Sequence, residues 1–78
     1  MPDLAMELSH LTLADAHIEQ ARGNIEAVAK RIASDREQGL DPAESMATLK
    51  TFSGTLAAFE AHRDLIVRTI ADIRSGKI

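Results

Sequence analysis

The side chains in this sequence that could do chemistry are its histidines and the charged residues beside them. His62, Arg63 and Asp64 are consecutive, and His17 lies two residues after Asp15. Imidazole and carboxylate groups suit Zn, Ni or Fe, so Asp15, His17 and His62 are candidate ligands of a transition metal. The same histidines are candidates for phosphotransfer, because a dimeric helical bundle can present a reactive histidine on an exposed face.

Other features of the sequence argue against catalysis. The chain has no Cys to serve as a nucleophile or a thiolate ligand. Its four glycines are isolated and form no loop that could hold a phosphate group. We therefore predict a protein that is not an enzyme and has no cofactor, in which the histidines make ordinary surface hydrogen bonds.

Arg63 lies where a hydrophobic pattern should continue. Apolar residues recur at alternating steps of three and four in both halves of the chain, after an opening step of seven from Leu4 to Leu11, which is the spacing of a heptad seam between helices. The two sets are Leu4, Leu11, Ala14, Ile18, Ala21, Ile25, Val28 and Ile32, and then Leu49, Phe52, Leu56, Phe59, Arg63, Ile66, Ile70 and Ile73. We predict that Arg63 forms a structural polar layer with Asp15; the alternative is an anion-binding arginine.

The segment REQGLDPAES predicts the boundary between two helices. Gly39 can adopt the left-handed conformation that ends a helix. Asp41 is a good N-cap, Pro42 suits the first helical position, and Glu44 is placed to complete a capping box. This short connection forces the helices to lie antiparallel.

These signals predict an all-α helical hairpin that forms one domain over residues 1–78. We expect helices over about residues 3–38 and 42–75, joined by a turn at 39–41. The segment Thr12–Asp15 resembles a capping box and would start the first helix near Leu13, but we favour the early start, with a kink between Ser9 and Thr12. In the antiparallel pair, the numbers of facing residues add to about 77 or about 84.

Gly23 and Gly54 fall inside the predicted helices. Glycine there costs about 1 kcal/mol relative to alanine. We interpret both glycines as sites where the two helices approach each other closely.

Composition excludes several classes of partner. The net charge is −3, with 9 basic and 12 acidic residues interspersed along the chain, which argues against nucleic-acid binding. No apolar run approaches the roughly 18 residues that a membrane span needs. The N-terminal segment lacks Lys and Arg and is not a signal peptide. We predict a cytoplasmic protein, in agreement with the absence of Cys.

Apolar residues outside the seam predict that the hairpin does not act alone. They are most frequent near the two chain termini, where an exposed patch would mark an interface. We predict a homodimer that forms a four-helix bundle, with a monomer that has a loose apolar face as the alternative. The residues expected to be buried in the assembled protein are Leu8, Leu11, Leu65, Val67 and Ile70. The predicted function is a non-enzymatic interaction module, a small regulator that acts through protein–protein contacts with a partner.

The segments LADAHIEQARGNI and LKTFSGTLAAFEAHRDLI, with a Gly-Leu-Asp turn between them, resemble small uncharacterised two-helix proteins of alphaproteobacteria. The resemblance covers about residues 11–68. Its matching positions are Asp15, His17, Ile18, His62, Arg63 and Asp64. It implies a bacterial cytoplasmic protein and assigns no activity to these residues.

Overall fold

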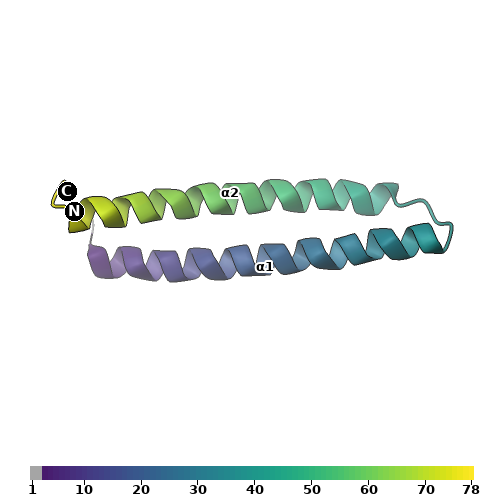
Figure 1. Ribbon diagram of the computed structural model, residues 1–78, viewed down its shortest axis with the longest axis horizontal. Helices are drawn as coiled ribbons and strands as arrows, with labels where there is room; N and C mark the ends of the chain where they lie inside the picture. Colours follow the sequence, from purple (N-terminus) through teal and green to yellow (C-terminus); the bar gives the residue numbers. More distant parts are fainter. Residues whose placement is uncertain (1–2) are drawn as a thin grey trace.

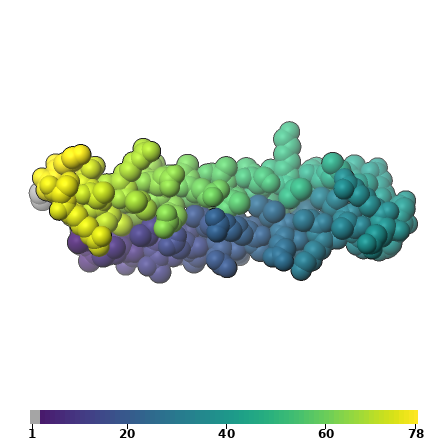
Figure 2. All heavy atoms as spheres, viewed as in Figure 1, coloured from purple at the N-terminus to yellow at the C-terminus, as the bar shows by residue number. Residues whose placement is uncertain are grey.

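The computed structural model describes residues 3–78 and shows two long antiparallel helices. Helix α1 spans Leu4–Glu37 and helix α2 spans Ala43–Arg74. They lie side by side, so that the start of α1 is next to the end of α2 (Figure 1). The hairpin is a rod of 59 × 15 × 15 Å, in which the N-terminal half of the chain runs along the C-terminal half (Figure 2). The predicted all-α hairpin is confirmed.

Helix α1 starts early because Asp3 caps it. Asp3 has extended backbone angles, and its side chain accepts a hydrogen bond from the backbone N–H of Ala5. Thr12 cannot act as an N-cap, since its hydroxyl donates back to the carbonyl of Leu8 inside the helix. The alternative start near Leu13 is therefore wrong, and α1 continues without interruption through the proposed kink at residues 9–12.

Helix α1 ends in the turn that the glycine predicts. Gly39 has a φ of 70° and donates its N–H to the carbonyl of Arg36, while the next residue, Leu40, donates to Asp35. This is the Schellman arrangement of hydrogen bonds, which satisfies carbonyls that the helix leaves free. Gly76 has a φ of 80° and ends α2 in the same way.

Helix α2 begins one residue later than expected. Pro42 is the N-cap, and Asp41 lies just before it, where its carboxylate accepts a hydrogen bond from the N–H of Ala43. Asp41 still satisfies a free N–H at the helix start, as its residue type indicates. Asp41 supplies the side-chain hydrogen bond at the start of α2, but Asp41 is not the N-cap of this helix. The capping box predicted for Asp41 and Glu44 is therefore not formed.

The core of the hairpin is the predicted seam. The most buried residues in the described chain all belong to it, and the other seam residues are partly buried. These most buried residues are Ala14, Ile18, Ala21, Ile32, Ile66 and Ile70. At the open end of the hairpin, which is the end opposite the turn, the residues Ala14, Ile66 and Ile70 form a cluster. Leu4 and Leu11 pack against this cluster. The core is therefore a single thin strip between two helices.

The pairing of the helices lies between the two predicted registers. Contacts between Asp15 and Arg63, and between Arg22 and Glu60, join residues whose numbers add to 78 and 82. The first sum agrees with the predicted value of about 77, and the second lies between the predicted values of about 77 and about 84. The interpretation of the helical glycines is wrong, because a Cβ atom at Gly23 or Gly54 would meet no atom of the partner helix within 4 Å.

Over residues 3–78, neither helix combines the length and the hydrophobicity that crossing a membrane requires.

Candidate functional site

Arg63 and Asp15 pair across the two helices, as expected. The Nε–H group of Arg63 donates a hydrogen bond to Oδ1 of Asp15. The pair is not buried: 39% of the Arg63 side chain and 53% of the Asp15 side chain remain exposed. The stem of Arg63 occupies the seam while its charged end reaches solvent, which is the usual arrangement for an arginine at such a position.

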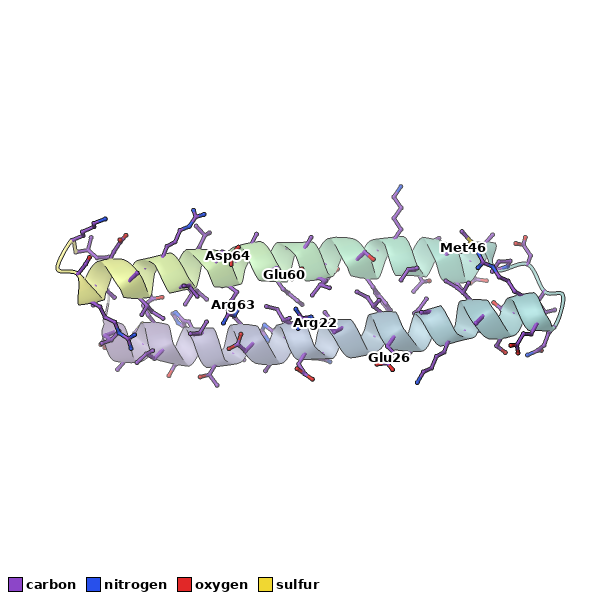
Figure 3. The ribbon with its side chains drawn as sticks, viewed as in Figure 1. Arg22, Glu26, Met46, Glu60, Arg63 and Asp64 are labelled. Carbon is purple, nitrogen blue, oxygen red and sulfur yellow. The ribbon has the colours of Figure 1, made fainter. Side chains whose placement is uncertain are left out.

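A second ion pair lies beside the first and was not predicted. Nη2 of Arg22 is 3.7 Å from Oε2 of Glu60. Arg22 lies seven residues after Asp15, and Glu60 lies three before Arg63, so the heptad pattern already places both on this side of the hairpin. Figure 3 shows Arg22 and Arg63 at the space between the two ribbons, with Glu60 close by on α2.

The surroundings of these pairs do not favour the binding of an anion. The shallow depression between them is also lined by Glu19 and Asp64. Four carboxylates and two arginines therefore face it, and the negative charges outnumber the positive ones. Since Arg63 is already hydrogen-bonded to Asp15, the geometry fits the structural polar layer better than an anion-binding arginine.

The histidines gather on the opposite side of the hairpin. His17 and His62 lie at a similar height, as expected, and line one groove together with His10, Leu13 and Ala14. His10 is the member of this group that the sequence did not single out. It lies three residues after Glu7, and its Nδ1 atom is 3.7 Å from Oε2 of Glu7; the Glu-x-x-His spacing was the signal for this contact.

A second depression continues the groove along the same side. Its lining residues are His17, Gln20, Ala21, Asn24, Phe52, Thr55 and Phe59. The rings of His17 and Phe59 have centroids 5.4 Å apart and are inclined by 32°. The lining of this depression thus combines aromatic and small apolar side chains with uncharged polar ones. We call this side the histidine face and the side with the two ion pairs the charged face.

The proposed metal ligands do not come together. Asp15 is on the charged face, where it binds Arg63, whereas His17 and His62 line the groove on the histidine face. Successive residues of an α-helix are rotated by about 100°, so residues two apart point in nearly opposite directions. Within residues 3–78, no group of three or more His, Asp or Glu side chains is placed to hold a metal ion.

The predicted interface residues differ in exposure within the single chain. Ile70 is buried and Leu11 is partly buried, since both pack at the open end of the seam. Leu65 is 59% exposed, and Leu8 and Val67 are each 39% exposed. Leu65 lies three residues after His62 on the histidine face, whereas Val67 lies seven after Glu60 on the charged face. A partner that covers one face would therefore cover only part of this set.

The chain matches no protein-family model, and comparisons with curated proteins and with solved structures found no protein that matches it.

Proposed function

We propose that this chain is a non-enzymatic helical interaction module that dimerises into a four-helix bundle. The observation that carries the proposal is the amount of surface that the hairpin leaves exposed. The chain exposes 5687 Å², whereas a compact protein of its mass of 8.5 kDa exposes about 4,700 Å². The excess of about 1,000 Å² is close to the roughly 800 Å² that each partner contributes to a standard interface.

The shape of the hairpin supports the same proposal. The radius of gyration is 17.6 Å, against about 11 to 12 Å for a compact domain of 78 residues. A rod of two helices has only one seam in which to bury side chains, and large apolar residues remain on its surface. The most exposed of these within the helices are Met6, Leu13 and Leu65. Packing a second hairpin alongside would give these side chains a core, as in other four-helix bundles.

A regulatory role in bacteria forms the second part of the proposal. An amphipathic helix can lay its apolar face into a groove of another protein, and the two long helices of this hairpin are suited to contacts of that kind. The resemblance to small alphaproteobacterial proteins supports the bacterial and cytoplasmic setting.

Sedimentation equilibrium tests the dimer. We expect a mass of twice the chain mass at low micromolar concentrations, and a thermal midpoint that rises with protein concentration, because mass action stabilises an associated state. A single species with the mass of one chain up to about 100 μM, with a concentration-independent midpoint, would contradict the dimer.

A further inference from the structure

The two faces of the hairpin differ in the charge that a partner would have to bury. The charged face carries the Arg63–Asp15 and Arg22–Glu60 pairs, together with Glu19 and Asp64. Covering this face would remove several charged groups from water, which costs free energy unless each finds a well-placed partner. Interface cores are accordingly depleted of charged residues.

The histidine face is free of such groups along most of its length. The positions that continue the spacing of His10 and His17 along α1, from Met6 to Ala27, include no Asp, Glu, Lys or Arg. The same holds in α2 from Thr48 to Thr69 for the positions that continue the spacing of His62 and Leu65, whereas Glu44 and Asp72 continue this spacing at the two ends of the helix. The carboxylate of Glu7 lies beside this face, where its Oε2 atom is 3.7 Å from Nδ1 of His10. This side of the rod can therefore be desolvated at lower cost than the charged face.

The histidine face also combines hollows with projecting apolar side chains. The groove and its neighbouring depression share His17 and have Ala14, Ala21 and Phe59 among their lining residues. Leu13 and Leu65 are 56% and 59% exposed on the same face. In a two-fold dimer, each copy places its own projecting side chains against the hollows of the other. A surface with both features can be complementary to itself.

We propose that the histidine face is where a second copy of this chain docks, with Leu13 and Leu65 as its apolar anchors. The proposal rests on the dimer proposed above and names the surface that forms it. A second copy fits for two reasons. The excess exposed area is close to the area that one partner contributes to a standard interface, and a face whose central part carries no Asp, Glu, Lys or Arg can meet its own copy with little repulsion, although each chain carries a net charge of −3. The charged face would then remain on the outside of the bundle.

Matched lysine substitutions at two neighbouring positions of α2 test the proposal. Leu65→Lys places a charge on the histidine face, and Val67→Lys places the same charge two residues later on the charged face. Both side chains are exposed in the hairpin, so neither change disturbs the seam. We expect Leu65→Lys to raise the dimer Kd at least about 100-fold, since it would bury an unpaired charge. Val67→Lys should change it by no more than about threefold.

A second measurement keeps the proposal testable if a lysine variant does not fold. Because the chain has no Cys, a single introduced thiol gives an unambiguous signal. Leu13→Cys should react slowly with a thiol reagent at concentrations where the protein is dimeric and quickly on dilution to the monomer. Leu8→Cys, on the charged face, should react quickly in both conditions.

The outcomes separate this proposal from the one on which it rests. A wild-type monomer in sedimentation overturns the dimer and the docking face together. If the wild type is a dimer and Leu65→Lys leaves its Kd unchanged, docking on the histidine face is contradicted but the dimer is not. The same conclusion follows if Val67→Lys weakens the dimer as much as Leu65→Lys does. Equal and rapid labelling of Leu13→Cys and Leu8→Cys in the dimer would also contradict docking on the histidine face while leaving the dimer itself in place.

Discussion

Arg63 shows how a charged residue can occupy a hydrophobic seam at little cost. Its stem lies between the helices, and its guanidinium reaches Asp15 at the solvent-exposed edge. A pair this exposed gains little stability, because water screens the charges and the side chains lose freedom when they are held. The pair therefore matters more for aligning the two helices than for holding them together.

A double-mutant cycle on Arg63→Ala and Asp15→Ala measures this pair. We expect a coupling of about 0–1 kcal/mol in the free energy of unfolding, well below the 3–5 kcal/mol typical of breaking a buried pair. Unfolding by urea at a fixed protein concentration gives the four values. A coupling above about 3 kcal/mol would show that assembly buries the pair.

Replacing the arginine by leucine probes the seam itself. Arg63→Leu should equal or exceed the wild type in stability, because an apolar side chain then continues the seam between Leu56 and Ile70. Arg68→Leu, at an exposed position of α2, is the control and should change the free energy of unfolding by no more than about 0.5 kcal/mol. A large loss with Arg63→Leu alone would indicate that the charge is required in the folded protein.

At the scale of the helices, two kinds of glycine have opposite roles. Gly39 lies outside the helix with a φ of 70°, a conformation that L-residues with a side chain rarely adopt. Gly54 lies inside α2, where it weakens the helix and where an added Cβ would meet no neighbouring atom within 4 Å. The same substitution should therefore have opposite effects at the two positions.

Gly54→Ala should raise the free energy of unfolding by about 1 kcal/mol through helix propensity, and Gly39→Ala should lower it by about 1–2 kcal/mol through backbone strain. Urea denaturation followed by circular dichroism compares the two variants. If Gly54→Ala instead destabilised the protein or changed its mass, another helix would have to pack closely against that glycine in the assembled state.

The first two turns of α1 cover one end of the core. Leu4 and Leu11 pack against the cluster of Ala14, Ile66 and Ile70. Deleting residues 1–11 should therefore lower the free energy of unfolding by about 2 kcal/mol or more and weaken the oligomer. The double variant Leu4→Ala/Leu11→Ala keeps the helix length and should reproduce most of this loss. Unchanged stability after the deletion would show that these contacts contribute nothing.

At the scale of the whole molecule, the rod shape determines how copies can associate. Packing along the long axis covers seam-flanking side chains, whereas packing end to end covers only the turn or the termini. Small-angle X-ray scattering of the dimer should therefore give twice the mass with a longest dimension close to the 59 Å of one hairpin. A longest dimension near twice that value would contradict side-by-side packing.

The sequence by itself determined the local features of this protein. The C-terminal ends of both helices follow from Gly39 and Gly76, because a positive φ depends on the residue type. The start of α1 at Asp3 was one of two starts that the capping signals allowed, and it is the one that gives α2 a partner along its whole length. The seam follows from the heptad spacing, which repeats along one side of a helix. Even the partner of Arg63 was predictable, since an antiparallel hairpin with a short turn brings the residues near Asp15 alongside it.

Only the tertiary structure decided how the two seams align and what each side of the hairpin carries. Heptad spacing permits several alignments that bury similar apolar residues, so it could not select the observed register. That register brings Arg22 to Glu60 and places His62 of α2 in one groove with His10 and His17 of α1. It also leaves Leu13 and Leu65 exposed, because two helices alone can bury only the side chains that point between them.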